Sequence, residues 1–398
     1  MRFKRFLRCG ALLLCGLFAF AGCGGAEDER EEEGNMPVAE YPDYDYSDYS
    51  IAAYTAPFWG GERVGNETVL FVGEEGAPLL FADAEIESVR SYDLQTEYDE
   101  SDYRLEDGVL YRTETSRIPA LSVAEMYPSS YVEGKTWNKK GGGYIAFSEG
   151  SYFSSMQVAV TYTHKSAWSG FVPPDCSAKA APFLQRLAEG KSVQIAFFGD
   201  SITAGYNASG MIDYPPYAPP YADLVGGYIK ARYPDSRVSW INEGVGGTNS
   251  VWGLENVMEK TAEYPIDLAV IAFGMNDSYA ADAHASYARN MAEFVLSANP
   301  DACVVLVATM LPNPEAEGIA VRQETYEAAL LAVAETLPNV CVAPVTSVHA
   351  ALLETKRYAD MTGNNVNHPN DFLMRVYAQT ILRTVLGDAY TPLAAEEG

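Results

Sequence analysis

Ser201 and His368 are the pair of residues in this chain best suited to covalent chemistry. Ser201 ends the run Gly199-Asp200-Ser201, directly after the apolar stretch 193–198, and His368 lies near the C-terminus before Pro369. A serine hydroxyl becomes a nucleophile when a neighbouring base takes its proton, and histidine is a common base for that step. Gly-Asp-Ser is also an ordinary turn sequence, so the assignment depends on further segments downstream.

Two such segments follow later apolar runs. Gly244-Val245-Gly246-Gly247 comes after the run 237–242, and Gly274-Met275-Asn276-Asp277 comes after the run 268–273. Taken alone, the first could be a tight turn and the second a helix N-cap pair. Together with Ser201 they place small and polar residues at the ends of three predicted strands.

The elements that must position these residues alternate between strand and helix. Amphipathic helical patterns at 224–229, 287–295 and 326–337 separate predicted strands and support crossover connections. A last helix is predicted after Pro369, with its apolar residues on one face. A parallel sheet covered on both faces is therefore expected, with its binding crevice at the carboxyl ends of the strands. The predicted strands are 193–198, 237–242, 268–273, 303–309 and 340–345.

In this order the four segments, ending with His368, resemble the sequence blocks of the SGNH/GDSL hydrolase family, over about residues 193–386. The resemblance implies a flavodoxin-like α/β domain of three layers with strand order 2-1-3-4-5. It also implies an esterase that needs no metal or cofactor, with Ser201 as nucleophile and His368 as base. The implied oxyanion donors are the Ser201 N–H, the Gly247 N–H, with Gly246 as alternative, and the Asn276 side chain.

One position departs from the family pattern. The family places an aspartate three residues before the histidine, where this chain has Asn365. An asparagine accepts a hydrogen bond but brings no charge to the imidazole. We expect a dyad in which Asn365 or a backbone carbonyl orients the ring, with Asp371 and Asp360 as candidates for a displaced acid. Asp371 could instead simply cap the last helix.

The remaining histidines are expected at the surface or in packing roles: His164, His284 and His349. Of these, His164 could line a cleft between domains. The aromatic loop 206–217, together with Trp252, could form a rim that stacks on sugars, or it could be ordinary packing.

The N-terminus is typical of export. Residues 1–22 combine four basic residues, a short apolar run and a small-residue end, as a signal peptide does. Cys23 then resembles the lipidated cysteine of a bacterial lipoprotein. We expect an extracytoplasmic protein anchored to the bacterial cell membrane through Cys23; a plain signal peptide or an uncleaved anchor are the alternatives.

The domain prediction divides the rest of the chain by its composition and its strand and helix patterns. Residues 23–50 are an acidic linker rich in tyrosine and aspartate. Residues 51–174 show short β-like runs typical of a β-sandwich, and Asp107-Gly108 between two of these runs predicts a hairpin. This jelly-roll-like arrangement ahead of a GDSL domain resembles one class of carbohydrate esterases. Residues 175–192 are a connector, 193–388 the hydrolase domain and 389–398 a C-terminal tail.

Charge and cysteine content limit the partners. The formal net charge is −27 at pH 7, and loss of residues 1–22 would make it more negative. Such a surface repels phosphates, so nucleic acid is not an expected partner. Cys303 and Cys341 lie in predicted strands and are expected to be buried thiols, and no CxxC or histidine-rich metal spacing occurs. The sequence does not indicate an oligomeric state.

The expected function is hydrolysis of O-acyl esters, chiefly O-acetyl groups, on a polysaccharide. A lipid or general carboxylesterase and a transacylase would use the same residues. A catalytically inactive, carbohydrate-binding surface lipoprotein is the alternative from another class, and Asn365 is the feature that favours it.

Overall fold

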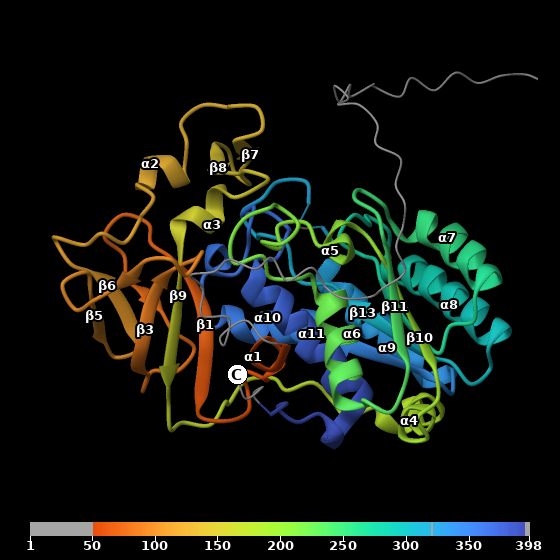
Figure 1. The fold of residues 1–398 in the computed structure, drawn as a ribbon. Helices are drawn as coiled ribbons and strands as arrows, with labels where there is room; N and C mark the ends of the chain where they lie inside the picture. Colours follow the sequence, from red (N-terminus) through yellow and green to blue (C-terminus); the bar gives the residue numbers. More distant parts are fainter. Residues whose placement is uncertain (1–50, 320, 395–398) are drawn as a thin grey trace, which may run out of the picture. The chain divides into compact units, whose positions relative to one another are not determined.

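The computed structural model describes residues 51–319 and 321–394. The C-terminal half of the described chain contains a five-stranded parallel sheet with strand order β11-β10-β12-β13-β14. Figure 1 labels β10, β11 and β13 of this sheet among the surrounding helices. In chain order the sheet is 2-1-3-4-5, so the predicted flavodoxin-like α/β fold is confirmed. The predicted signal peptide, Cys23, the predicted acidic linker and the end of the predicted tail lie outside the described residues.

The elements of this α/β part agree closely with the predicted strands. Its strands are β10 (Val193–Gly199), β11 (Val238–Gly244), β12 (Leu268–Ala272), β13 (Cys303–Ala308) and β14 (Val340–Pro344). Its helices are α4 (Ala181–Ala188), α5 (Ser201–Ala204), α6 (Tyr221–Arg232), α7 (Ser250–Glu263), α8 (Ala281–Ala298), α9 (Tyr326–Thr336), α10 (Val345–Leu353) and α11 (Asp371–Leu386).

Alternate residues of the central strands pack into different cores. On β10, Ile195 and Phe197 join the core that contains α4, α6, α10 and α11. The neighbouring Ala196 and Phe198 join the core that contains α7, α8 and α9. Helices therefore cover both faces, because a strand points successive side chains to opposite sides.

Helix α11 is buried on nearly all sides, whereas the sequence predicted one buried face. All its residues except Arg383 are buried. Its polar side chains bind segments that precede the sheet: Arg375 donates to the backbone oxygens of Gly65 and Asn66. Gln379 donates to those of Tyr54 and Ala56. The N-terminal region thus covers the face of α11 that a lone α/β domain would leave in solvent.

The region before the α/β part is rich in antiparallel strands. Its sheets have the orders β1-β9-β3-β4, β2-β6-β5 and β7-β8. Its strands are β1 (Arg63–Leu70), β2 (Ala77–Pro78), β3 (Glu85–Ser91), β4 (Glu97–Tyr98), β5 (Tyr103–Glu106), β6 (Val109–Arg112), β7 (Thr136–Asn138), β8 (Tyr144–Ala146) and β9 (Gln157–Thr163). Its short helices are α1 (Ile51–Thr55), α2 (Val123–Met126) and α3 (Tyr152–Met156). A jelly-roll-like sandwich stays a prediction.

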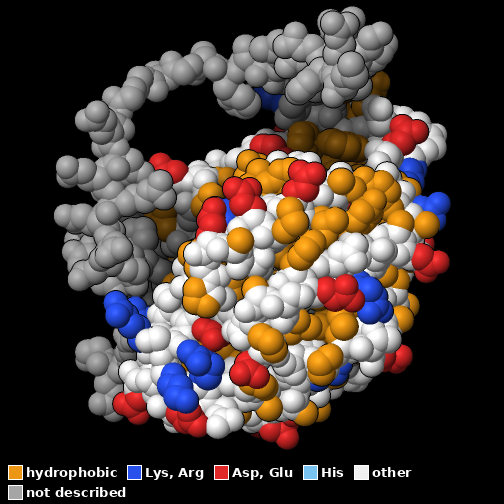
Figure 2. All heavy atoms as spheres, turned by 90° about the vertical axis from the view of Figure 1, so that its right-hand side faces the viewer, with side chains coloured by type: hydrophobic (Ala, Val, Ile, Leu, Met, Phe, Trp, Pro, Cys, Tyr) orange, Lys and Arg blue, Asp and Glu red, His pale blue; other side chains and the backbone are white. Residues whose placement is uncertain are grey.

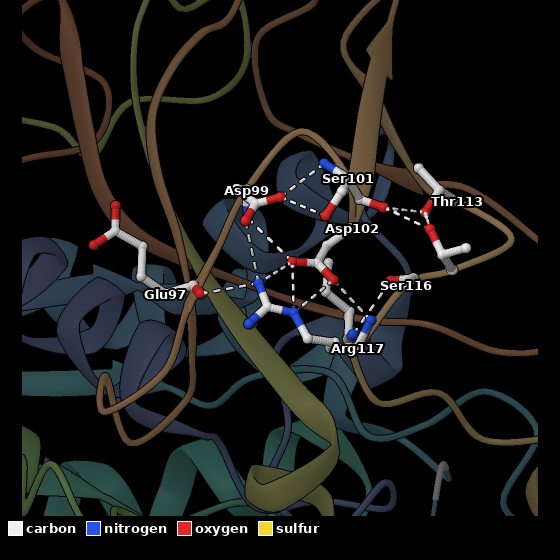
Figure 3. A network of polar contacts seen from close by, with 9 residues as sticks. Glu97, Asp99, Ser101, Asp102, Thr113, Ser116 and Arg117 are labelled. Atoms are coloured by element: carbon white, nitrogen blue, oxygen red, sulfur yellow. Dashed lines mark hydrogen bonds and ion pairs between the residues drawn. The ribbon is translucent and has the colours of Figure 1, made fainter.

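Tight turns and ion pairs shape this region. Glu106 pairs with Val109 across the Asp107-Gly108 turn, which confirms the predicted hairpin. Nearby, Arg117 Nε lies 3.0 Å from Asp102 Oδ1, and the guanidinium also reaches Asp99, as Figure 3 shows. Hydrogen bonds from Arg117 lower the pKa of Asp102 to about 2. This buried carboxylate therefore ties the turn before β5 to the segment after β6.

A buried ion pair joins β1 to the α/β part. Lys356 Nζ lies 2.6 Å from Glu67 Oε1, and both side chains are fully buried. The Tyr162 hydroxyl donates to the other oxygen of Glu67 at 2.5 Å. Residues of β1, β3 and β9 belong to the same hydrophobic core as α6 and α11. The β-rich region and the α/β part thus share one hydrophobic core.

Helices α7 and α10 were missing from the sequence prediction. Asn249 caps α7 by accepting the N–H groups of Val251 and Trp252. Figure 2 shows the side of the molecule on which α7 and α8 lie, where apolar side chains are interspersed with charged ones. Val251 and Met258 of α7 are among its exposed apolar residues.

Two further observations concern the whole described chain. Among residues 51–319 and 321–394, no helix is both long and apolar enough to cross a membrane. Cys303 and Cys341 are buried free thiols, as expected.

Candidate active site

Ser201 stands where the first strand of the sheet turns into a short helix. Strand β10 ends at Gly199, Asp200 caps α5 by accepting the Ile202 N–H at 3.0 Å, and Ser201 is the first helical residue. A Cβ at Gly199 would lie 1.9 Å from Thr203 Oγ1 and 2.7 Å from the Ala272 oxygen. A glycine is therefore required for the tight turn that presents Ser201 at the carboxyl edge of the sheet.

His368 faces Ser201 directly. Its Nε2 atom lies 2.9 Å from Ser201 Oγ, within hydrogen-bonding distance. Both side chains are largely buried. When the ring proton sits on Nδ1, the serine hydroxyl donates to Nε2, which is the arrangement that a general base requires.

Two oxygens face the other nitrogen of the ring. Asn207 Oδ1 lies 2.8 Å from His368 Nδ1, and Glu149 Oε2 lies 3.2 Å from it. Asn207 follows α5, whereas Glu149 comes from the N-terminal region between β8 and α3. Burial opposes ionisation of Glu149, but hydrogen bonds from His368 and Asn364 outweigh it and lower its pKa. Neither residue was expected to contact His368, although Asn207 lies in the loop 206–217 that was predicted as a possible rim.

The residues expected to orient His368 lie elsewhere. Asn365 has a left-handed backbone, with φ +64°, and its Nδ2 donates to the Ala146 oxygen at 2.9 Å. Asp371 Oδ1 accepts the Ser209 N–H at 2.8 Å, and Asp360 accepts the Leu70 N–H. Within the described residues none of the three contacts the imidazole, so the expectation is corrected in favour of Asn207 and Glu149.

Two of the three predicted oxyanion donors, Gly247 and Asn276, lie in or against the loop after β11. Gly247 has a φ of +77°, which favours glycine. Asn276 Nδ2 donates to the Thr248 oxygen at 2.9 Å, so its amide lies against this loop. In the part of the chain that the structure describes, neither the Ser201 nor the Gly247 N–H has a hydrogen-bond partner. Among the described residues the two N–H groups are therefore unengaged, and Asn276 Nδ2 has a second hydrogen to donate.

A buried serine, aspartate and histidine hold this loop to the end of β12. Asp277 accepts the Ser250 N–H at 3.0 Å and the Ser250 hydroxyl at 2.5 Å. Its Oδ2 also lies 2.9 Å from His284 Nδ1. Burial would raise the pKa of Asp277, but hydrogen bonds from His284 and Ser250 lower it overall. The cluster fixes the start of α7, two residues after Thr248.

The other histidines pack in the interior. His164 stacks on Phe81 with ring centroids 3.5 Å apart. His284 stacks on Tyr326 in the same way. Burial lowers the pKa of His349 to about 3, and its Nδ1 accepts the Leu311 N–H. The structure therefore places His368, and none of these three, beside Ser201.

The predicted aromatic rim is only partly present. The Tyr206 ring lies edge-on to His368, with centroids 5.5 Å apart, and 44% of the residue is exposed. Trp252 instead packs against Phe273. Tyr206 is therefore the rim residue in contact with the histidine.

A known protein family matches the part of the chain that carries these segments. Residues 197–376 match the GDSL-like Lipase/Acylhydrolase family. This GDSL-like segment contains Ser201, Gly247, Asn276 and His368, but not Glu149. No curated protein matches the chain.

Several solved structures are similar to it. Two are structures of a two-domain esterase active on acetylated mannans: one, with mannopentaose, is 20% identical and covers 53% of this chain and 54% of its own, with a TM-score of 0.44. The other is 21% identical and covers 57% of each chain, with a TM-score of 0.45. A catalytic mutant of an acetylxylan esterase from Geobacillus stearothermophilus is 19% identical and covers 50% of this chain and 96% of its own, with a TM-score of 0.42. The chain thus spans little more than half the length of the mannan esterase.

Proposed function

We propose that the protein is a serine esterase in which Ser201 is the nucleophile and His368 the base. The observation that carries this proposal is the 2.9 Å contact between Ser201 Oγ and His368 Nε2 at the carboxyl edge of the sheet. Nucleophile and base within hydrogen-bonding distance, with the base oriented by further groups, are the geometry of nucleophilic acyl transfer.

The reaction follows from the positions of these atoms. Ser201 Oγ forms a bond to the ester carbonyl carbon while His368 Nε2 takes its proton. The carbonyl oxygen becomes negative and is stabilised by the N–H groups of Ser201 and Gly247 and by the Asn276 amide. His368 then returns the proton to the departing alcohol oxygen. Water then attacks the carbonyl carbon of the acyl-serine while His368 takes its proton. The bond to Ser201 Oγ breaks, the proton returns to this oxygen and the acid is released.

The proposed substrates are O-acyl esters on a polysaccharide, chiefly O-acetyl groups. This substrate class rests on the resemblance of the segments to esterases and on Tyr206, an exposed aromatic ring beside His368 that can stack on a sugar. We propose also that residues 1–22 direct export and that a lipid on Cys23, outside the described residues, anchors the protein to the cell membrane. A lipid esterase would use the same atoms and is distinguished by the assay below. A transacylase would also use them, but would pass the acyl group to another alcohol instead of to water.

Asn365 no longer favours the alternative of an inactive carbohydrate-binding protein. That alternative depended on Asn365 as a replacement for the missing acid, and the Asn365 side chain faces Ala146 instead. Two other oxygens face His368 Nδ1, one of them from a carboxylate.

The test is acetate release by the purified protein from p-nitrophenyl acetate and from acetylated xylan, beside Ser201→Ala. We expect activity on both substrates and its loss in the variant. Activity on p-nitrophenyl esters of long fatty acids but not on acetylated xylan would favour a lipid esterase. Equal activity of the variant would refute the mechanism.

A further inference from the structure

We propose that Glu149, supplied by the N-terminal β-rich region, is the positioning carboxylate of the Ser201–His368 pair. The inference deepens the proposed function and rests on it. It gives the β-rich region a role in the proposed reaction, because Glu149 lies outside the GDSL-like segment, residues 197–376.

The Glu149 carboxylate is held in place relative to the imidazole. Its Oε2 atom lies 3.2 Å from His368 Nδ1, and its Oε1 atom accepts a hydrogen bond from Asn364 Nδ2 at 3.1 Å. Asn364 Oδ1 in turn accepts the backbone N–H groups of Val366, Asn367 and His368, each at 3.0 Å. These three bonds fix which end of the Asn364 amide faces Glu149. One buried side chain therefore holds both the backbone of His368 and the carboxylate beside its ring.

Asn207 and Glu149 have different roles at His368 Nδ1. Asn207 Oδ1 is the closer acceptor, at 2.8 Å, and its Nδ2 donates to the Gly150 and Gly363 oxygens. Because the NH₂ end of the amide is engaged, the oxygen must face His368. A neutral acceptor of this kind selects the tautomer with hydrogen on Nδ1. It brings no charge to a ring that gains a proton during the reaction.

Glu149 supplies that charge. When Ser201 Oγ bonds to the carbonyl carbon, its proton moves to Nε2 and the ring becomes a cation. A carboxylate in contact with the ring favours this state by Coulomb attraction, although the 49% exposure of the Glu149 side chain means that solvent screens part of the effect.

Another charged group also faces His368. Asp200 interacts electrostatically with the ring from the turn before Ser201, and burial raises its pKa to about 7, so it carries only part of a charge at neutral pH. The pKa of Glu149 is lowered, because its hydrogen bonds outweigh its burial. Of the two carboxyl groups, Glu149 is the one that is ionised throughout the neutral range. The Tyr206 ring completes the contacts of the imidazole without a charge.

The test is Glu149→Gln, which removes the charge and keeps the size. Glu133→Gln is the matched control, because Glu133 is an exposed glutamate of the same β-rich region. We expect kcat for p-nitrophenyl acetate to fall about 10- to 100-fold in Glu149→Gln, with KM and the thermal midpoint close to those of the wild type. The acidic limb of the kcat/KM profile should move to lower pH, since the variant no longer favours the protonated ring. Glu133→Gln should leave all of these unchanged.

A second measurement does not depend on catalysis. The chain has four histidines, so the ring resonances of ¹⁵N-labelled histidine can be followed by NMR through a pH titration. In Glu149→Gln the titration of His368, assigned with His368→Gln, should move to lower pH while the other rings keep theirs. An unmoved His368 titration, or a kcat within twofold of the wild type in an active enzyme, would overturn the inference. An inactive wild-type protein would instead refute the proposed function, and the NMR titration would still decide the role of Glu149.

Discussion

The Nδ1 atom of His368 lies 2.8 Å from the side-chain oxygen of Asn207, a residue that follows the nucleophile by only six positions. The orienting group thus comes from the loop after Ser201 instead of the segment that carries the histidine. The nucleophile and one of the groups that orient its base therefore come from the same short segment after β10.

Replacing Asn207 by glycine should separate this role from that of Asn365. Both asparagines have a left-handed backbone, with φ +65° and +64°, so glycine is allowed at either position. Asn207→Gly should lower kcat about 10-fold or more, because the ring loses the acceptor that selects its tautomer. Asn365→Gly is the matched control and should stay within threefold of the wild type. Steady-state kinetics on p-nitrophenyl acetate measures both, and a larger loss in Asn365→Gly would contradict the assignment.

Asn276→Ala should lower kcat about 10²- to 10³-fold, since loss of one oxyanion donor typically has that effect. KM should change little, because the donor acts on charge that develops in the transition state. Asn276 also donates to the Thr248 oxygen, so part of the loss could come from the loop. Thr248→Ala keeps that backbone oxygen and serves as control. If both variants lose activity equally, Asn276 acts by holding the loop.

Asp371→Asn should preserve activity and change how stability depends on pH. Burial raises the pKa of Asp371 to about 6, so this carboxyl stabilises the fold most below its unfolded pKa and loses that contribution as pH rises through 6. The neutral asparagine has no such dependence. From pH 4 to pH 8 the unfolding free energy of the variant should therefore rise relative to the wild type by about 1–3 kcal/mol. Urea unfolding across this range measures it, and a constant difference would show that Asp371 ionises normally.

Removing one partner of the buried pair of Lys356 and Glu67 should destabilise the fold more than removing both, because a single substitution leaves the other charge buried and unpaired. Lys356→Met leaves Glu67 buried without its cation and should reduce the unfolding free energy by about 3–5 kcal/mol. The double variant Lys356→Met/Glu67→Gln should regain much of this loss, since the amide oxygen of the new side chain would still accept the Tyr162 hydroxyl. A double-mutant cycle by chemical denaturation tests the pair, and additive losses would mean that the charges do not interact.

Local patterns were enough to predict most of the fold. The apolar runs identified all five strands of the parallel sheet, and the Asp107-Gly108 turn identified the β5–β6 hairpin. The surroundings of α11 were not predictable in this way, because its outer face is buried by Gly65 and Asn66 of β1. No periodicity within the helix indicates a partner that lies so far away in the chain.

The candidate site likewise contains residues that the sequence identified and residues that it missed. Ser201 and His368 lie in recognisable segments, and the structure brings them together. Asn207 and Glu149 were missed because hydrogen-bonding partners of a ring nitrogen are set by tertiary packing. The sequence drew attention to this segment, because Asn365, next to Asn364, stands where the resemblance predicts an acid. Only the structure shows that the left-handed backbone of Asn365 turns its side chain away from His368.

The most direct test of the account is to trap the acyl-enzyme. Rapid quenching of the protein with p-nitrophenyl acetate, followed by peptide mass spectrometry, should show one acetyl group on Ser201 and a matching burst of p-nitrophenol. Ser201→Ala should show neither, and His368→Ala should form the adduct far more slowly. A wild-type protein that releases acetate without any acetyl group on Ser201 in the burst phase would contradict the central claim.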